Sequence, residues 1–337
     1  MLDWPDDAVE RWFDPRPALG DPLVVWTVAL VAVALTLLPI IARFLPAKVR
    51  ADVMARWKGW LALAPLMLVP VLLGAAWVFA ATLALALLCY RELARATGLF
   101  RERVVSTAVV FGIAVVFFAA ADNYYELFVA SWPLGVGFIA LAALVGDRPK
   151  GYLQRTALAA LSFMLFGAGL GHLAYFANDA SFRPILVWLL VAVELNDVFA
   201  YTCGRALGPL TGGRKLAPQT SPNKTLAGSI GAVCLTVPLT VVLGKIAWAG
   251  EPLAATHHLV ALGVLIGVLG QCGDLILSSV KRDLGLKDLG NAFPGHGGLL
   301  DRFDSLLLVA PAVFHYCGYV RGIGLEAPRR LISAGWF

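Results

Sequence analysis

The feature that most constrains this chain is a series of long, continuous apolar runs. A bilayer core of about 30 Å needs about 20 apolar residues per helix, and the chain reaches that length repeatedly between short polar stretches. The runs do not alternate apolar and polar residues, and only helices and closed barrels satisfy their backbone in lipid. We therefore predict an all-α polytopic membrane protein with about ten transmembrane helices, at about 23–41, 60–90 (two helices that divide near Gly74), 104–121, 127–146, 156–177, 184–203, 226–248, 259–280 and 303–320.

The composition agrees with an exterior that faces lipid. Only 15% of the residues are charged and 59% are hydrophobic, whereas about a quarter of a soluble domain is charged. The five cysteines are scattered and form no CxxC pair, so we interpret them as reduced packing residues and not as zinc ligands or disulfides. Four histidines outside the polar loops are interpreted as structural, namely His172, His257, His258 and His315.

The basic residues predict which loops face the cytoplasm. Twenty of the 27 Lys and Arg residues lie in five alternate loops, at 43–58, 91–103, 147–155, 204–225 and 281–302. Cytoplasmic loops carry such an excess, so these loops are predicted to be cytoplasmic and the N-terminus to lie outside. Three arginines near the C-terminus do not fit, so either the tail lies along the membrane surface or the span count is off by one. They are Arg321, Arg329 and Arg330.

One predicted helix ends in a polar stripe. Asp274, Ser278 and Lys281 follow at i, i+4 and i+7, with Arg282 next, so they share one helical face. An aspartate inside an apolar span is costly and by default indicates a functional site. The alternative is that Asp274 only pairs with a basic residue and holds helices together.

The loop that follows combines glycine with both signs of charge. Lys287 and Asp288 precede the segment 294–298, PGHGG, whose glycines let several backbone N–H groups approach phosphate oxygens. From Asp274 to Asp304 the chain has five aspartates and four basic side chains. Hard oxygen ligands suit magnesium and cations suit phosphates. We therefore predict a site for magnesium and a polyphosphate.

Two further groups extend this site. Asp301, Asp304 and Ser305 lie at i, i+3 and i+4 and so face together at the start of the last span. His296, in the glycine segment, is a catalytic candidate, and its alternative is a hydrogen-bonded loop histidine.

A second polar cluster lies upstream. Glu194, Asn196 and Asp197 are deep in an apolar span, and Glu194 and Asp197 share one helical face. The loop 204–225 that follows is rich in hydroxyl and ammonium groups that can bind an anion. The alternative for its lysines is simple membrane topology.

These residues resemble a known family. The run 278–304, SSVKRDLGLKDLGNAFPGHGGLLDRFD, is similar to the pattern of the phosphatidate cytidylyltransferases at each of its defined positions. The segments 196–208, NDVFAYTCGRALG, and 214–225, RKLAPQTSPNKT, also resemble that family, and the segment 90–93 resembles its weaker N-terminal region. The likeness covers roughly residues 50–320.

The resemblance implies an enzyme that makes CDP-diacylglycerol and pyrophosphate from CTP and phosphatidate with magnesium, and it leaves a second cation open. It implies a bacterial inner-membrane protein with its active site facing the cytoplasm. Its partners would be CTP, phosphatidate and the bilayer, with no nucleic acid and with a homodimer left open. By position, the implied metal ligands are Asp197, Asp274, Asp288, Asp301 and Asp304. The implied catalytic residues are Asp288, Lys281, Arg282, Lys287, His296 and Arg302, and the implied substrate-binding residues are Lys215, Ser221, Lys224, Gly295, Gly297 and Gly298.

The chain is predicted to divide into four parts. They are an N-terminal segment with one extra transmembrane helix (1–50), an N-terminal transmembrane bundle (51–180), a catalytic transmembrane region with cytoplasmic loops 204–225 and 281–302 (181–320), and a C-terminal tail (321–337).

The sequence departs from the family pattern at two places. Leu226 and Ala227 stand where an aromatic and an acidic residue are common, and Leu277 stands where many members have Glu. Either departure could alter nucleotide affinity or indicate a different lipid acceptor. The first alternative is therefore a CTP-dependent cytidylyltransferase or kinase that acts on another membrane lipid, such as a polyprenyl lipid. The second is an ion-coupled transporter that uses the intramembrane acids.

Overall fold

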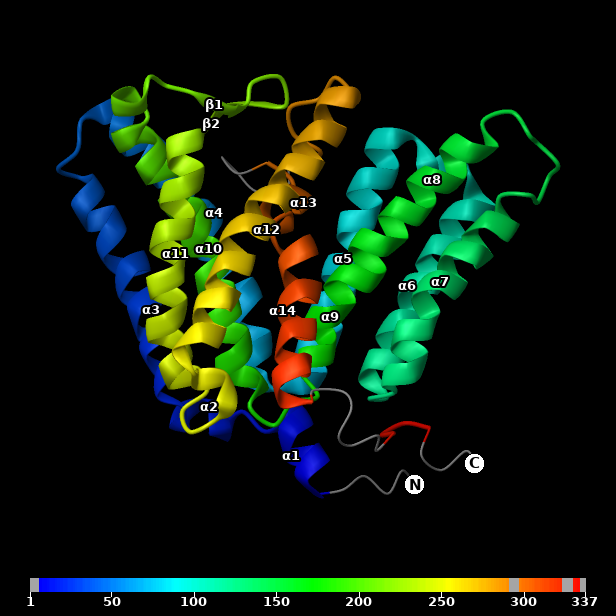
Figure 1. The fold of residues 1–337 in the computed structure, drawn as a ribbon, viewed down its shortest axis with the longest axis horizontal. Coiled ribbons are helices and arrows are strands. Elements are labelled where there is room, and N and C mark those ends of the chain that lie inside the picture. The colour runs from blue at the N-terminus through cyan, green and yellow to red at the C-terminus, as the bar shows by residue number, and fades with distance from the viewer. Residues whose placement is uncertain (1–5, 291–296, 323–329, 334–337) are drawn as a thin grey trace.

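Ten helices in the computed structural model are long and apolar enough to cross a membrane, within the described residues 6–290, 297–322 and 330–333. They run side by side between a face that carries a β-hairpin and a face that carries α1 and α2 (Figure 1). This confirms the prediction of a multi-pass, essentially all-α protein. The spans are α3 (Pro22–Ala42), α4 (Ala47–Leu73), α5 (Ala75–Thr97), α6 (Arg103–Ala121), α7 (Tyr125–Ala142), α8 to α9 (Tyr152–Phe176), α10 (Phe182–Leu207), α11 (Leu226–Ala247), α12 (Thr256–Asp283) and α13 to α14 (Leu300–Arg321).

Two of these spans are interrupted, and short elements join the others. Between α8 (Tyr152–Ser162) and α9 (Leu170–Phe176) the helix widens to a π-helix at Phe163–Gly169, and α13 (Leu300–Phe303) is followed by α14 (Leu306–Arg321). The short elements are α1 (Asp6–Phe13), α2 (Arg16–Gly20), the 3-10 turns η1 (Leu99–Arg101), η3 (Pro209–Thr211) and η4 (Pro252–Ala254), and strands β1 (Lys215–Ala217) and β2 (Ser221–Thr225).

The long apolar run divides where the sequence predicted it would. Gly74 separates α4 from α5 with a φ of 133°, a value that side chains with a Cβ rarely adopt. A Cβ at this position would lie 2.4 Å from the carbonyl oxygen of Trp12. The turn therefore requires glycine twice, for its backbone angle and for the close approach of α1.

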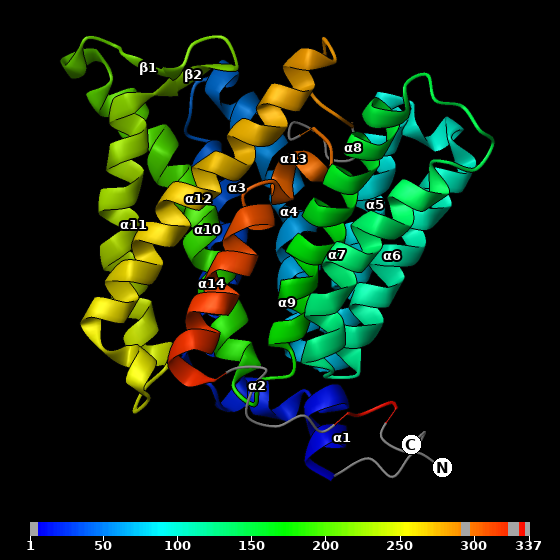
Figure 2. The same ribbon diagram turned by 45° about the vertical axis from the view of Figure 1, so that its right-hand side comes forward.

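Eight of the ten spans form two groups, and α3 and α4 pack against each other and against α10. Helices α10, α11, α12 and α14 pack against one another, and α5 to α9 pack into a second group beside them (Figures 1 and 2). Association of helices in lipid depends on close packing, which small residues allow. In the first group, a Cβ at Gly228 would lie 2.5 Å from the carbonyl oxygen of Ala200, so α10 and α11 touch backbone to backbone.

The β-hairpin was not predicted. Strands β1 and β2 pair antiparallel, with Lys215 opposite Thr225 and Ala217 opposite Ser221, inside the polar loop 204–225. A three-residue strand in a polar loop has no alternating apolar pattern to reveal it. The hairpin lies at the same face of the molecule as the loop after α12 (Figure 1). It therefore presents its basic residues beside that loop.

The opposite face explains why Arg321 did not fit the charge pattern. Its guanidinium forms ion pairs with Asp179, at 2.9 Å, and with Glu251, at 2.5 Å. Arg321, at the end of α14, thus links the connection between α9 and α10 to the connection between α11 and α12, and its charge is neutralised there. An end of α14 at this face agrees with ten spans. The tail also touches this face, because Asp122 accepts hydrogen bonds from the backbone N–H groups of Ile332 and Ser333.

Replacing Arg321 with alanine is expected to lower the free energy of unfolding by about 1.5–3 kcal/mol, because two partly buried carboxylates lose their charged hydrogen-bond donor. Burial raises the pKa of Glu251, and the Arg321 guanidinium opposes that shift. A carboxyl group whose pKa is raised by folding stabilises the folded state at low pH. That stabilisation is lost as the pH rises through the folded-state pKa. The difference in Tm between Arg321→Ala and the wild type should therefore become smaller as the pH is lowered. Arg16→Ala, at an exposed pair with Asp14, should change Tm little.

Candidate active site

Three helices meet closely at the site. A Cβ on Gly273 of α12 would lie 2.4 Å from the carbonyl oxygen of Asp304, which lies between α13 and α14. One turn earlier, a Cβ on Gly270 would lie 3.2 Å from the amide nitrogen of Asn196 in α10 and 3.7 Å from the Cβ of Ser305. These glycines let the polar residues of three helices gather inside the bundle.

Substituting Gly273 with alanine is expected to lower stability by about 1–3 kcal/mol, because the methyl group would meet backbone that can only move away. The same shift would separate the carboxylates of Asp274 and Asp304, so catalytic rate should fall as well. Thermal unfolding and turnover are measured together. Gly137→Ala in α7, with open space at its Cβ, is the matched control and should affect neither. Unchanged unfolding in Gly273→Ala would contradict the close contact.

A group of three carboxylates lies where these helices meet. Asp304 interacts electrostatically with Asp197 of α10 and Asp274 of α12. The hydroxyl of Ser305 donates to Asp197 at 3.5 Å, and the hydroxyl of Ser278 donates to Asp274 at 3.0 Å. The second contact confirms the predicted stripe on α12. We call Asp197, Asp274 and Asp304 the carboxylate group.

Cations from other elements reach this group. Lys224 of β2 forms an ion pair with Asp274, so Asp274 does pair with a basic residue, but that residue lies in the hairpin and not on another helix. Arg302 is exposed and interacts electrostatically with Asp197 and Asp304. The site therefore combines acidic oxygens with cations at its edge.

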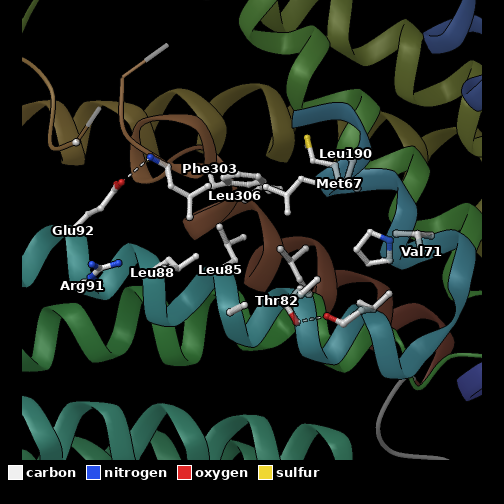
Figure 3. A pocket seen from close by; sticks show the side chains of 18 of the residues that line it. Met67, Val71, Thr82, Leu85, Leu88, Arg91, Glu92, Leu190, Phe303 and Leu306 are labelled. Atoms are coloured by element: carbon white, nitrogen blue, oxygen red, sulfur yellow. Dashed lines mark hydrogen bonds between the residues drawn. The ribbon is translucent and has the colours of Figure 1, made fainter. Parts of the chain in front are cut away.

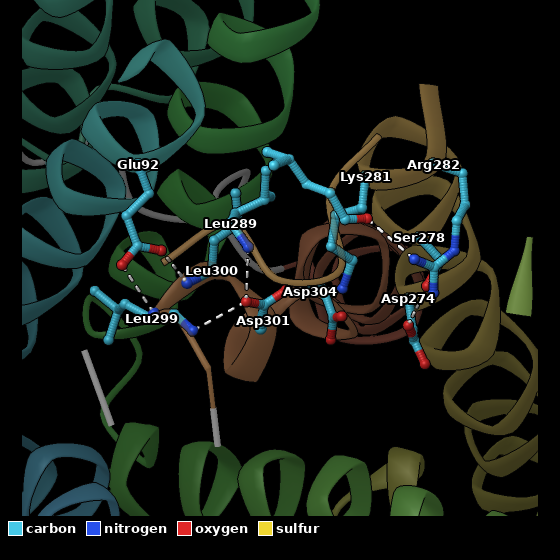
Figure 4. A network of polar contacts seen from close by, with 12 residues as sticks. Glu92, Asp274, Ser278, Lys281, Arg282, Leu289, Leu299, Leu300, Asp301 and Asp304 are labelled. Atoms are coloured by element: carbon cyan, nitrogen blue, oxygen red, sulfur yellow. Dashed lines mark hydrogen bonds and ion pairs between the residues drawn. The ribbon is translucent and has the colours of Figure 1, made fainter. Parts of the chain in front are cut away.

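A second set of contacts orders the loop after α12. Lys281 donates to Asp301 over 2.7 Å, and both side chains are largely buried (Figure 4). The other oxygen of Asp301 accepts from the backbone N–H of Leu289 at 3.2 Å and of Gly298 at 2.9 Å. With its oxygens engaged in these contacts, Asp301 is better suited to fixing the loop than to binding a metal.

Gly297 lies between two of the predicted aspartates. Its φ is 80°, and an added Cβ would lie 3.0 Å from a carboxylate oxygen of Asp301 and 3.4 Å from one of Asp288. The five predicted metal ligands thus fall into two neighbouring sets, the carboxylate group and the pair Asp288 and Asp301. Lys281 joins them, since it pairs with Asp301 and interacts electrostatically with Asp304.

Glu92 of α5 is a site residue that sequence reasoning did not single out. Its two carboxylate oxygens accept from the backbone N–H groups of Leu299, at 3.0 Å, and Leu300, at 2.9 Å (Figure 4). Added Cβ atoms on Gly290 and Gly298 would lie 2.6 and 2.7 Å from it. Glu92 therefore holds the start of α13 in place. The only signal in the sequence was the resemblance of the segment 90–93.

The remaining predicted residues lie at the hairpin face. Arg282 links the loop and the hairpin, donating to the carbonyl oxygens of Leu286 at 3.0 Å and of Thr220 at 3.1 Å. Ser221 is half-buried in β2, whereas three predicted side chains are exposed, namely Lys215, Lys287 and Asp288. Gly295 and His296 lie outside the described residues. Of the departures, Leu277 is fully buried, and Leu226 and Ala227 begin α11 directly after the hairpin.

The described part of the chain has no group of three or more His, Cys, Asp or Glu side chains close enough around one point to hold a metal ion by themselves. Magnesium, however, usually keeps several waters and binds one or two carboxylates together with substrate phosphates. The separated oxygens of the carboxylate group suit that mode, with phosphates completing the shell. They do not suit a closed protein cage.

The sequence profile of the cytidylyltransferase family matches residues 54–320, which include every residue of this site. The chain belongs to the cytidylyltransferase family. An Escherichia coli (strain K12) relative, named uncharacterized protein YnbB, is 37% identical over 216 residues, covering 62% of this chain and 69% of that protein.

Two further relatives carry the name phosphatidate cytidylyltransferase. One from Bacillus subtilis (strain 168) is 38% identical over 129 residues, which cover 38% of this chain and 45% of that protein. One from Brucella abortus (strain 2308) is 40% identical over 133 residues, with the same two shares, 38% and 45%. The match therefore spans less than half the length of these two proteins.

Proposed function

We propose that this protein transfers the cytidylyl group of CTP to phosphatidate, forming CDP-diacylglycerol and pyrophosphate. The observation that carries the proposal is the carboxylate group with Lys224, Lys281 and Arg302 around it, at one end of a membrane-spanning bundle. A lipid phosphate lies at the membrane surface, and a nucleotide arrives from water, so the two reactants would meet there. The names of the Bacillus and Brucella relatives support this choice of substrates.

The proposed reaction is an in-line displacement. A phosphate oxygen of phosphatidate attacks the α-phosphorus of CTP, and a new P–O bond forms as the bond from that phosphorus to the β-phosphate's bridging oxygen breaks. Pyrophosphate leaves with this oxygen. A phosphate monoester is already ionised at neutral pH, so no strong general base is needed. The chain must instead position two anions and neutralise their charge.

Each residue type has a part in this scheme. Lys224 and Arg302 lie beside the carboxylate group and would bind phosphate oxygens, while the Lys281–Asp301 pair fixes the loop that borders them. Magnesium would be held by one or two carboxylates of the carboxylate group together with the phosphates. When bound, it supplies charge neutralisation for the phosphoryl oxygens.

We also propose that the hairpin face is cytoplasmic and that the membrane is the bacterial inner membrane. In the bundle of ten spans, the five loops with twenty of the 27 basic residues lie at the hairpin face. Loops with such an excess of Lys and Arg are retained on the cytoplasmic side. A homodimer stays a prediction, which the mass of the purified protein in detergent would test.

The decisive assay incubates purified protein in detergent with labelled CTP, phosphatidate and magnesium. CDP-diacylglycerol and pyrophosphate are expected in equal amounts, and chelation of magnesium should stop their formation. Phosphorylated lipid with free CDP would instead indicate a CTP-dependent kinase. Turnover with a polyprenyl phosphate and none with several phosphatidates would assign another acceptor. Asp288→Ala tests whether the exposed aspartate of the loop contributes.

A further inference from the structure

An apolar cavity of about 530 Å³ lies beside the site, between α4, α5, α10 and the start of α14 (Figure 3). Aliphatic side chains such as Met67, Leu85 and Leu190 form its walls. Its volume is within the range of small-molecule pockets. Two of its lining residues, Leu66 and Leu88, are exposed, and the walls offer a lipid chain no polar partner along most of their length.

The cavity has a polar end with unused positive charge. Arg91 and Arg95 of α5 line it there and are exposed, and neither has a hydrogen bond or ion pair with the residues the structure describes. At i and i+4 they share one helical face. Glu92 also lines this end, but its carboxylate is engaged by the N–H groups of Leu299 and Leu300. Two free guanidinium groups therefore border an apolar cavity.

The cavity is as long as one lipid chain. Along α5 its lining before the arginines extends from Val78 to Leu88, a rise of about 15 Å at 1.5 Å per residue. One leaflet of a hydrocarbon core of about 30 Å is about 15 Å thick. With arginines at the hairpin face and the apolar walls directed into the bundle, the cavity has the polarity of one phospholipid in that leaflet.

The polar end also adjoins the reaction site. Gly290 and Leu299 line the cavity. The residues next to them in the chain, Leu289 and Gly298, donate their backbone N–H groups to Asp301. A phosphate at the arginines would thus lie next to the loop that Lys281 and Asp301 order.

We propose that this cavity holds one acyl chain of the phosphatidate acceptor and that Arg91 and Arg95 bind its phosphate. The inference rests on the proposed function and assigns its lipid subsite. Lipid tails are as apolar as the cavity walls, so burial of the chain adds little affinity in a membrane. Affinity must come from the arginines, which suit a phosphate monoester with nearly two negative charges. The walls set which chain lengths fit.

Photocrosslinking without CTP tests this directly. A phosphatidate with a diazirine at the end of one acyl chain is bound to the full chain in detergent and irradiated. Labels are expected on Val71, Val78 and Leu85, which line this cavity and not its neighbour, with competition by unlabelled phosphatidate and not by phosphatidylcholine. Labels on Trp26 and Leu243 would overturn the inference, because these line a different cavity, between α3, α4, α10 and α11.

The arginines are tested in the same assay. Arg91→Ala with Arg95→Ala should reduce labelling at limiting lipid at least about tenfold, since hydrogen bonds to charged groups are lost. It should raise KM for phosphatidate and leave KM for CTP unchanged. Arg43→Ala, an exposed arginine at the end of α3, is the matched control. Equal labelling of the double variant and the wild type would contradict the proposal.

A cavity-filling variant tests the walls, with thermal unfolding as a check on folding. Ala81→Phe should shift the preferred acyl length to shorter chains, and Leu85→Ala should admit longer ones. An unchanged length preference in both folded variants would contradict the assignment. Labelling without turnover would refute the proposed reaction and keep the lipid site. Turnover together with labels elsewhere would support the proposed reaction and contradict the lipid site.

Discussion

Replacing Asp304 with asparagine is expected to lower the turnover of CTP by about 10²- to 10³-fold, the usual cost of removing one electrostatic contact to a reacting phosphate or carbonyl. Asp304 is largely buried where α12 and α14 touch, and it interacts with Asp197 and Asp274. Asparagine keeps its size and the oxygen that accepts the N–H of Ser305 at 2.8 Å. The protein should therefore fold, while the group loses the negative charge that would hold magnesium.

The measurement is turnover as a function of magnesium concentration, with thermal unfolding in parallel. The variant should need more magnesium for half-maximal rate. Asp283→Asn is the matched control, because Asp283 is an exposed aspartate at the end of α12 near the same membrane face. A rate within a few-fold of wild type in Asp304→Asn, at unchanged magnesium dependence, would remove Asp304 from the site.

The sequence was sufficient for the membrane architecture because lipid imposes a simple rule. Each span had to be a continuous apolar run of sufficient length, and the division near Gly74 followed from a run that was too long. Arg321 did not fit because its ion pairs, with Asp179 and Glu251, join residues that lie far apart in the chain. Distances of that kind depend on packing, which hydropathy does not contain.

The site was predictable where contacts are local. The spacing of Asp274 and Ser278 on one helix is enough to predict their hydrogen bond. The pairing of Lys224 with Asp274 crosses fifty positions and depends on a hairpin that no periodic pattern indicated. Glu92 lies still further away in the chain, and its part in holding α13 appears only when α5 lies beside that helix.

Spacing also could not separate two kinds of aspartate. Asp301 and Asp304 are three residues apart and both lie at the mouth of the last span, so the sequence offered both as metal ligands. In the structure, Asp301 accepts from an ammonium and two backbone N–H groups. Asp304 faces other carboxylates. The two positions therefore lead to different expectations when each is neutralised.

Substituting Asp301 with asparagine is expected to lower the free energy of unfolding by about 3–5 kcal/mol, because Lys281 is left as a buried charge without its partner. The amide would also turn a donor toward Lys281 or toward the N–H groups of Leu289 and Gly298. Tm should fall strongly, and the variant should lose activity at temperatures where the wild type is stable. At low temperature, its magnesium requirement should equal that of the wild type, unlike that of Asp304→Asn.

A double-mutant cycle separates the ion pair from the rest of the loop. Lys281→Met should be destabilising alone, since it leaves the Asp301 carboxylate with only its two backbone donors. Lys281→Met combined with Asp301→Asn should cost less than the sum of the two single changes, because the uncompensated charge is absent. If Asp301→Asn instead kept the wild-type Tm and raised the magnesium requirement, Asp301 would be a metal ligand after all. The loop would then be held in place by Glu92 and Arg282.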